Sequence, residues 1–100
     1  MQEIDLTILR KLDKTTTQKS LAEELEISVG KLNYKLNTLI DKGLVKSERF
    51  INSKNKIQYK YFLTSDGINK KIKLTREFIK RKKAEYEELQ AELDKSLGEE

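Results

Sequence analysis

The stretch from residue 28 to residue 43, SVGKLNYKLNTLIDKG, carries hydrogen-bonding side chains on one side of a helix and aliphatic side chains on the other. At about 100° per residue, the apolar face holds Val29, Leu32, Leu36, Leu39 and Ile40. The polar side and its flanks hold Gly30, Lys31, Asn33, Tyr34, Lys35, Asn37, Thr38 and Asp41. Ammonium, phenol, amide and hydroxyl groups suit the recognition of a polar, anionic partner.

Composition excludes most catalytic and metal-binding chemistry. The 100-residue chain has no Cys and no His, which removes disulfides, thiol nucleophiles, imidazole bases and the zinc sites built from those ligands. The four glycines stand far apart, so they form no phosphate-binding loop. Glu23 and Glu24 are paired acids, but adjacent residues of a helix point apart. We therefore expect a binding protein that is not an enzyme and holds no cofactor and no metal.

Length and composition also limit the number of domains and the cellular location. One hundred residues correspond to one domain with, at most, an appended helix or tail. No apolar run approaches the ~20 residues that a membrane span requires, and MQEIDLTILR lacks the residue order of a signal peptide. We expect a cytoplasmic protein that does not enter a membrane.

Positive charge is concentrated in the middle of the chain. Residues 28–60 hold eight Lys or Arg residues against two acids, Asp41 and Glu48, which is a local excess of six positive charges. Such an excess attracts polyanions and speeds their encounter. A solvated lysine-rich surface would have the same composition, so charge alone does not decide between the two interpretations.

The elements that position the polar face are predicted from periodicity. Residues 3–13 place Ile4, Ile8, Leu9 and Leu12 on one helical stripe, which a polar KTTT segment ends. Thr17 and Ser28 are good N-caps for a second and a third helix, separated by a turn of about three residues. Gly43 ends the third helix in a left-handed conformation, and the apolar Leu44 follows it.

From Leu44 the hydrophobic period changes to two. LVKSERFI and IQYKYFLT flank NSKNK, which predicts a hairpin with a basic tip. We expect the inward face of the second strand to cover the helices with Ile57, Tyr59, Tyr61 and Leu63. Phe62 points the other way, and the pattern gives no reason for it.

A long helix follows, capped by Thr64, because neither proline nor glycine interrupts residues 68–97. At full length it extends roughly 45 Å, far more than a domain of this size can cover. Its seam of apolar or tolerant positions comprises Ile68, Ile72, Thr75, Ile79, Tyr86, Leu89 and Leu93, with Lys82 interrupting it. We expect dimerisation through this seam from Ile72 onward. Leu6 lies outside the stripe of the first helix and is expected to join the contact by packing on a long C-terminal helix.

Charge along this helix is segregated. Residues 70–83 hold eight bases and one acid, whereas residues 84–100 hold one base and seven acids. Two parallel copies would set like charges beside each other, and two antiparallel copies would pair opposite charges. We therefore predict a homodimer with antiparallel C-terminal helices. A solvent-exposed helix or a frayed tail is the simpler alternative.

The order helix, helix, turn, helix, two-stranded hairpin predicts a winged helix-turn-helix, a mainly α fold with a small β-hairpin. We assign residues 1–64 to this domain and residues 65–100 to the long dimerisation helix. In this geometry the helix after the turn lies in the major groove of double-stranded DNA, and the hairpin tip reaches the backbone or the minor groove. The predicted DNA-binding residues are Ser28, Gly30, Lys31, Asn33, Tyr34, Lys35, Thr38, Arg49, Lys54 and Lys56. Asn33 and Asn37 would serve equally as polar boundary residues, and the tip as a plain solvated turn.

The segment TTQKSLAEELEISVGKLNYKLNTLIDKGLV, the hairpin and LTSDG together resemble the MarR-type winged helix regulators, most closely the small subgroup associated with bacterial exopolysaccharide (EPS) gene clusters. The resemblance implies a homodimeric transcriptional regulator that binds a pseudo-palindromic site. The turn carries Glu26 where helix-turn-helix proteins often have glycine, which costs about 1 kcal/mol if the position needs positive φ. Typical members use additional terminal helices to form a small-ligand pocket, so a small-molecule ligand is doubtful in this shorter chain.

A second function remains open from the sequence. Winged helices also serve as scaffolds, and fold does not fix function. The alternative is a protein-protein interaction module that uses its long charged helix to bind a partner chain.

Overall fold

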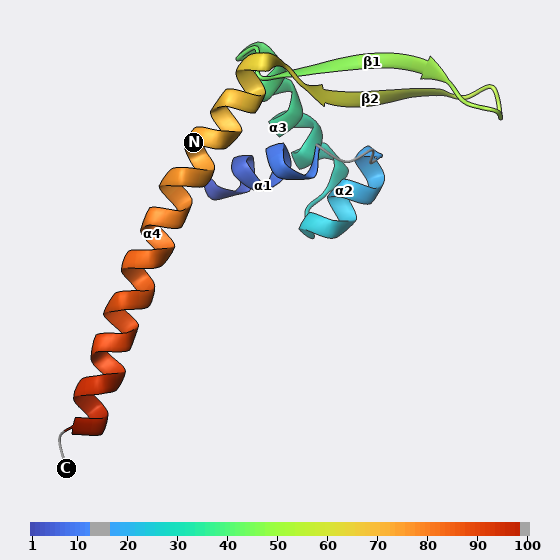
Figure 1. Cartoon of the computed structure of the whole chain (residues 1–100). Helices are drawn as coiled ribbons and strands as arrows, with labels where there is room; N and C mark the ends of the chain where they lie inside the picture. The colour runs from blue at the N-terminus through green and yellow to red at the C-terminus, as the bar shows by residue number, and fades with distance from the viewer. Residues whose placement is uncertain (13–16, 99–100) are drawn as a thin grey trace.

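The structure is a computed structural model that describes residues 1–12 and 17–98. In chain order its elements are α1 (Glu3–Lys11), α2 (Gln18–Leu25), α3 (Val29–Asp41), β1 (Val45–Ile51), β2 (Ile57–Leu63) and α4 (Ser65–Gly98). Within the described ranges the strands form a single antiparallel pair, and the rest of the regular structure is helical (Figure 1). The predicted fold class is confirmed. Most of the predicted KTTT break, and the last two residues of the predicted 65–100 helix, lie outside the described residues.

Hydroxyl side chains cap the N-termini of three of the helices, as predicted. Thr17 accepts a hydrogen bond from the backbone N–H of Ser20 at 3.1 Å, and Ser28 accepts one from Lys31 at 3.0 Å. Thr64 accepts one from the N–H of Gly67 at 2.9 Å. Each bond satisfies a donor that the first turn of a helix leaves free, so local chemistry fixes where α2, α3 and α4 start.

The turn between α2 and α3 adopts the conformation in which Glu26 is strained. Glu26 has φ 56° and ψ 40°, in the left-handed region. The N–H of Ile27 reaches back to the carbonyl of Ala22 at 3.1 Å, and that of Glu26 reaches Glu23 at 3.2 Å. This is a Schellman ending, in which glycine is usual. Gly43 ends α3 in the same way, as predicted, with φ 75°.

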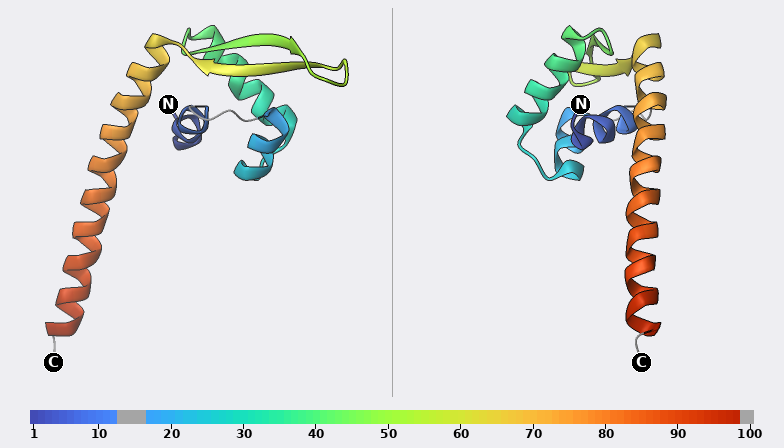
Figure 2. Two further views of the ribbon diagram at one scale, coloured as in Figure 1. Left: turned by 45° about the vertical axis from the view of Figure 1, so that its right-hand side comes forward. Right: turned by 90° about the vertical axis from the view of Figure 1, so that its left-hand side faces the viewer.

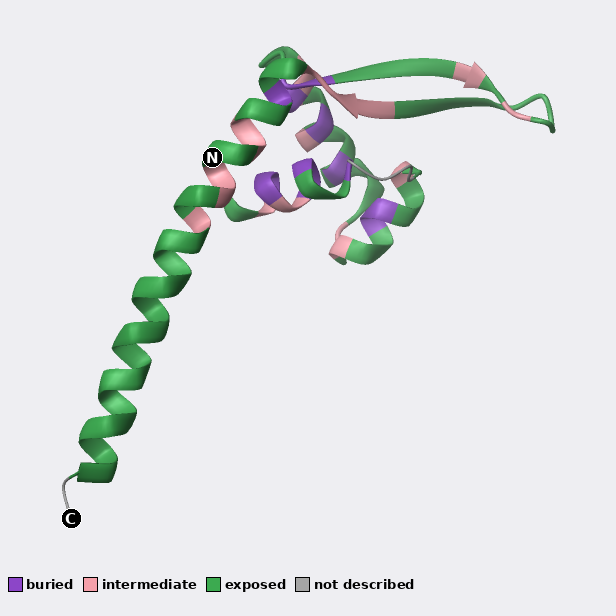
Figure 3. Cartoon of the chain, viewed as in Figure 1, coloured by how far each residue is buried: buried purple, intermediate pink, exposed green. Residues whose placement is uncertain are grey.

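The core lies where the first three helices meet the start of β1. Its buried apolar members are Ile8, Leu9, Leu12, Leu21, Ala22, Leu32, Leu36, Leu39, Leu44 and Val45, and these segments are purple in Figure 3. Val29 lies on the predicted apolar face of α3 but does not join this core, because 49% of its surface is exposed. Val29 is the first residue of α3.

The hairpin projects beyond the helical body (Figure 1). Tyr61 and Leu63 are half-buried against the core, as predicted, but Ile57 and Tyr59 are exposed, which corrects the expectation that the whole face covers helices. Ile57 and Tyr59 face the start of α2 across an open cavity, which they line together with Gln18. On the opposite face Phe62 is half-buried, and the ammonium nitrogen of its register partner Lys46 lies 5.9 Å from its ring centre.

A tight joint connects the hairpin to α4. The Leu44 carbonyl accepts a hydrogen bond from the Thr64 N–H at 3.0 Å, and the Thr64 hydroxyl donates to the Gly43 carbonyl at 2.6 Å. A Cβ atom added to Gly67 would lie 1.9 Å from the Leu44 carbonyl oxygen. The glycine of LTSDG therefore allows the start of α4 to approach the end of α3.

Beyond the joint, α4 passes α1 and then leaves the body. Its early residue Leu74 is half-buried against the core, whereas every described residue from 79 onward is exposed (Figure 3). The chain consequently measures 69 × 26 × 20 Å, with α4 as its long axis (Figure 2). Among the described residues, we find no helix with both the length and the apolar content needed to cross a bilayer.

Candidate nucleic-acid interface

The N-terminal turns of α3 present an open polar surface. Leu32, Leu36 and Leu39 are fully buried and hold the helix from one side. On the other side Lys31 is exposed, and 71% of the surface of Tyr34 is accessible. Neither side chain lies beneath another part of the chain that the structure describes. This surface is therefore held rigidly by apolar packing and remains free to meet a ligand.

Two small residues contribute at the start of α3. Ser28 is exposed but uses its hydroxyl oxygen to cap the helix. Gly30 is exposed, and a Cβ atom built on it would meet nothing within 4 Å. Intramolecular packing therefore does not require glycine at this position. The surface is open enough for the backbone of a large ligand to approach closely.

Thr38 and Asn33 have partners within the chain. The Thr38 hydroxyl donates to the Tyr34 carbonyl at 3.0 Å, and the side chain is half-buried. The Gln18 amide donates to the Asn33 side-chain oxygen at 3.2 Å, a link between α2 and α3 that the sequence did not reveal. Asn33 nevertheless stays exposed, so it has a boundary contact and still faces solvent.

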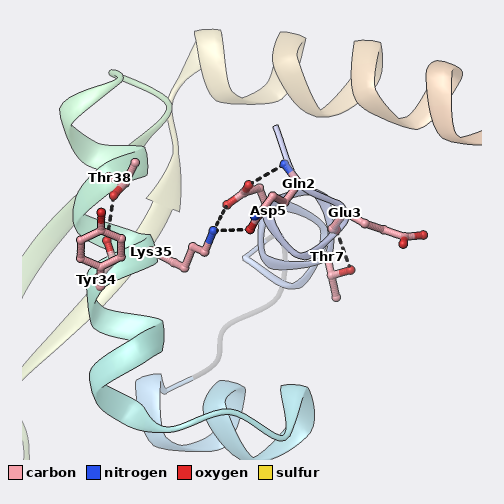
Figure 4. A network of polar contacts seen from close by, with 7 residues as sticks. All are labelled: Gln2, Glu3, Asp5, Thr7, Tyr34, Lys35 and Thr38. Atoms are coloured by element: carbon pink, nitrogen blue, oxygen red, sulfur yellow. Dashed lines mark hydrogen bonds and ion pairs between the residues drawn. The ribbon is translucent and has the colours of Figure 1, made fainter.

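Lys35 differs from the other candidates, because its ammonium group is already bound. Its Nζ lies 2.7 Å from Oε1 of Gln2 and 3.7 Å from Oδ1 of Asp5, both at the start of α1 (Figure 4). The Lys35 side chain is 18% exposed. Sequence reasoning missed Gln2 and Asp5, since nothing local signals that these residues meet a residue 30 positions away.

The hairpin tip is held by hydrogen bonds to both the backbone and the side chain of Asn52. The Asn52 side-chain oxygen accepts hydrogen bonds from the backbone N–H groups of Lys54 at 2.9 Å and Lys56 at 3.0 Å. Asn55 completes the turn with φ 58°, a conformation that asparagine tolerates. The two lysine side chains are exposed and, within the described part of the chain, make no ion pair or hydrogen bond. A protruding, ordered element therefore carries two available positive charges.

The sides of the hairpin also carry cations. Arg49 is exposed on β1, in register with Tyr59 of β2. Lys60 lies 4.8 Å from the ring centre of Phe50, which fixes its ammonium group over an aromatic face. Together with the tip lysines, these groups extend the positive surface along the hairpin.

The predicted seam of α4 is an exposed apolar stripe. Ile72, Ile79, Tyr86, Leu89 and Leu93 have between 45% and 66% of their surface accessible. Thr75 is half-buried, and its hydroxyl donates to the Lys71 carbonyl at 2.7 Å. The sequence reading omitted Leu97, which is 64% exposed and lies one turn beyond Leu93.

Leu6 has a different environment from the stripe. It is buried within its own chain, where it lines a shallow cavity with Leu74 of α4. The long helix that it packs beside is therefore the α4 of the same chain. In residues 1–12 and 17–98 we find no group of three or more Asp or Glu side chains that could hold a metal ion.

Comparison with known proteins agrees with this geometry. The sequence profile of the winged helix-turn-helix DNA-binding domain matches residues 1–46. The chain carries a winged helix-turn-helix. In this winged helix-turn-helix, α2 and α3 with the turn between them form the helix-turn-helix, and β1 and β2 form the wing. The search of curated proteins finds no match.

Solved structures share the same arrangement over most of the chain. A PadR family transcriptional regulator from Eggerthella lenta DSM 2243 is 19% identical, with a TM-score of 0.64 over 97% of this chain and 83% of its own. The S. aureus MepR–DNA complex is 21% identical, with a TM-score of 0.68 over 97% and 76%. A putative transcriptional regulator from Thermoplasma acidophilum is 25% identical, with a TM-score of 0.68 over 87% and 90%. At these identities the likeness shows a shared fold.

Proposed function

We propose that this chain is a sequence-specific DNA-binding transcriptional regulator that acts as a homodimer, with α3 in the major groove. The observation that carries the proposal is the open polar side of α3, where Lys31 and Tyr34 face solvent while three leucines hold the helix from behind. The match of residues 1–46 to a DNA-binding domain and the shared fold with MepR, which was solved with DNA, support it. Recognition and binding, not catalysis, are the activities that this surface supports.

The residues at the start of α3 take different roles in this proposal. Lys31 donates to guanine, and Tyr34 offers its hydroxyl to phosphate or its ring to a thymine methyl. Asn33 pairs with adenine if its link to Gln18 opens, and Thr38 donates to a flanking phosphate if its hydroxyl turns away from the Tyr34 carbonyl. Ser28 orients the first turn, and Gly30 lets the DNA backbone come close.

The wing supplies contacts that do not depend on sequence. Lys54 and Lys56 lie at the end of a protruding hairpin, so they reach phosphates or the minor groove beside the site read by α3. Arg49 adds a charge along the strand. Contacts of this kind position the protein and make its affinity sensitive to salt.

The second copy of the chain covers the exposed stripe of α4. A row of accessible aliphatic and aromatic side chains, interrupted at Lys82, on a helix that leaves the body is typical of a protein interface. The basic segment 70–83 and the acidic segment that follows favour an antiparallel pairing of two α4 helices. Residues 1–64 then act as the DNA-binding domain and residues 65–100 as the dimerisation helix. Leu6 contributes by holding α4 of its own chain in place.

The resemblance to MarR-type regulators, and among them to the EPS-associated subgroup, extends the proposal to a cytoplasmic regulator of bacterial genes. A homodimer with two-fold symmetry reads a pseudo-palindromic site, because half-site spacing follows the geometry of the dimer. No ligand-responsive pocket is part of the proposal.

The test is selection of bound sequences from a random duplex pool by the purified chain, with its mass in solution measured in parallel. The proposal predicts an enriched inverted repeat and the mass of a dimer. A matched selection with Tyr34→Ala, which removes an exposed side chain and should leave the fold intact, is expected to enrich no repeat. A monomeric mass, or a pool that stays random for the unmodified chain at low salt, contradicts the proposal.

The orientation of the α4 pair has a separate test. The chain has no native cysteine, so Gly98→Cys provides a single labelling site at the far end of α4. If the helices pair antiparallel about the boundary near residue 84, two labels lie roughly 40 Å apart at about 1.5 Å per residue. A parallel pair would bring the labels together to within about two helix diameters, roughly 20 Å. Distance measurement between spin labels distinguishes the two arrangements.

One observation also favours the protein-interaction alternative. The same exposed stripe and charge blocks would accept an α4-like helix from a different protein. Recovery of a stoichiometric protein partner, together with no shift of any duplex at low salt, would favour that function over DNA binding.

A further inference from the structure

A polar network joins α3 to α1 beside the proposed DNA-reading surface (Figure 4). Oδ2 of Asp5 accepts the backbone N–H of Gln2 at 2.9 Å, which caps α1. The other oxygen of Asp5 and the side-chain oxygen of Gln2 both face the Lys35 ammonium group, at 3.7 and 2.7 Å. The Asp5 carboxylate thus caps the N-terminus of α1 and also binds Lys35 of α3.

The Lys35–Asp5 ion pair is more shielded from solvent than the other ion pairs found among the described residues. Of the charged and polar residues that the structure describes, Asp5 alone is buried. The side chains of Lys35 and Asp5 are 18% and 12% exposed, whereas those of Lys11 and Glu24 are 45% and 50% exposed. Removing the lysine would leave a buried carboxylate without its cation, which is far less favourable than opening an exposed pair.

Helix α1, which Lys35 contacts, also packs against α4. Leu6, the neighbour of Asp5, is buried where α1 packs against α4, beside Leu74. Helix α1 therefore lies between the helix that carries the polar face and the helix that leaves the body. A lysine bound to α1 sets the position of α3 relative to both.

We propose that Lys35 is a positioning residue whose ammonium group stays on Asp5 and Gln2 when duplex DNA is bound. It fixes how α3 sits on α1 and does not neutralise a phosphate. This inference rests on the proposed function and changes the role of one residue within it. Lys54 of the wing, whose side chain has no partner among residues 1–12 and 17–98, is the contrasting case.

The experiment measures duplex affinity against salt concentration for the unmodified chain, Lys35→Met and Lys54→Met. Each lysine that neutralises a phosphate adds about 0.9 to the slope of log affinity against log salt. Lys54→Met is expected to lower the slope by about that amount. Lys35→Met is expected to weaken binding by about tenfold at every salt concentration, the scale of a lost coupling between contacting residues, and to leave the slope unchanged. A slope that falls in Lys35→Met as it does in Lys54→Met overturns the inference.

A second pair of variants gives a difference in sign. Asp5→Asn keeps an acceptor for the Gln2 N–H but removes the charge that holds Lys35. Glu3→Gln makes the same charge change at an exposed residue of α1 that does not contact Lys35 (Figure 4). Relative to Glu3→Gln, Asp5→Asn is expected to bind several-fold more weakly, since α3 loses its anchor. Stronger binding would mean that Asp5 had been holding Lys35 away from the DNA, which overturns the inference.

Circular dichroism checks that each variant folds, and Gln2→Ala, which removes one exposed acceptor, replaces Lys35→Met if that variant does not. Gln2→Ala is then expected to weaken binding with an unchanged slope, and a raised affinity or an altered slope contradicts the inference. The two proposals fail differently. If the unmodified chain binds no duplex, the proposed function fails, whereas normal binding with a reduced slope in Lys35→Met removes the positioning role alone.

Discussion

Replacement of Gly67 by alanine tests the joint between the wing and α4. A Cβ atom at this position would lie 1.9 Å from the carbonyl oxygen and 3.0 Å from the carbonyl carbon of Leu44. Contacts below 3.0 Å essentially never occur for real Cβ atoms, so Leu44 or the first turn of α4 must move by about 1 Å. The Leu44 carbonyl also accepts the hydrogen bond from Thr64, and Leu44 is buried, which leaves little room for the movement.

The expected destabilisation follows from three contributions. Overpacking of a buried site costs about 1–3 kcal/mol, and a weakened Leu44–Thr64 hydrogen bond costs about 1 kcal/mol more. Alanine offsets about 0.5–1 kcal/mol of this because it is less flexible than glycine in a helix. We therefore expect the free energy of unfolding to fall by about 1–3.5 kcal/mol.

Urea unfolding followed by circular dichroism measures the change. With a denaturant dependence of roughly 1–2 kcal/mol per molar urea, the midpoint should fall by about 0.5–3.5 M. Variants are compared at one protein concentration, since dimer formation makes stability concentration-dependent. Gly98→Ala is the matched control, because a Cβ atom there meets nothing within 4 Å. A midpoint for Gly67→Ala at or above that of the control would refute the close approach of α4 to Leu44.

Three further changes test separate parts of the structure. Glu26→Gly should raise the free energy of unfolding by about 0.5–1 kcal/mol, because glycine relieves the left-handed strain at φ 56°; an unchanged urea midpoint would show that the turn is not strained. Gly30→Ala should leave stability unchanged or slightly higher, yet lower duplex affinity by about fivefold, equivalent to one contact of about 1 kcal/mol; equal affinity in a titration would show that no DNA backbone approaches there. Burial, assisted by nearby Tyr59, raises the pKa of Tyr61 above its ordinary value of 10.0. The folded state thus favours the neutral phenol, which adds to the free energy of unfolding. This contribution is fully present below pH 10 and is lost as pH rises through the higher pKa of the folded state. Tyr61→Phe should weaken that alkaline loss in unfolding measurements, and an identical loss would contradict the assignment.

Helix and strand positions were predictable because their signals are local. A hydroxyl residue one position before an apolar helical stripe satisfies free N–H groups of the first turn, wherever that turn lies in the fold. Thr17, Ser28 and Thr64 all act in this way. The left-handed ending at Gly43 and the change to a period of two after it are equally local, and they placed the wing.

Burial was less predictable, because it depends on where neighbouring elements stop. Val29 and Tyr59 lie on the expected faces of α3 and β2, but both are about half exposed, and Tyr59 lines an open cavity with the start of α2 and does not pack on it. Periodicity gives the direction of a side chain and not the extent of the element opposite it. Exposure along α4 was predictable, because a helix of that length must extend beyond a small domain.

The residues of the candidate site also differ in how far the sequence predicts their environment. The solvent-facing positions of Lys31 and Tyr34 followed from helical angle alone. The partners of Lys35 did not, because Asp5 and Gln2 come from another helix and only the packing of α1 on α3 brings them there. A residue type suited to phosphate is therefore a weak guide where a buried carboxylate lies within reach.

The most direct test of the central claim compares duplex discrimination by the unmodified chain and by Lys31→Ala. Affinity is measured for the selected duplex and for one of unrelated sequence, from low to physiological salt. The account predicts tighter binding of the selected duplex, affinities that fall steeply with salt, and a loss of discrimination of about 1–3 kcal/mol in Lys31→Ala. Binding that ignores salt, or discrimination that survives unchanged in Lys31→Ala, would contradict the claim that the outer side of α3 reads DNA.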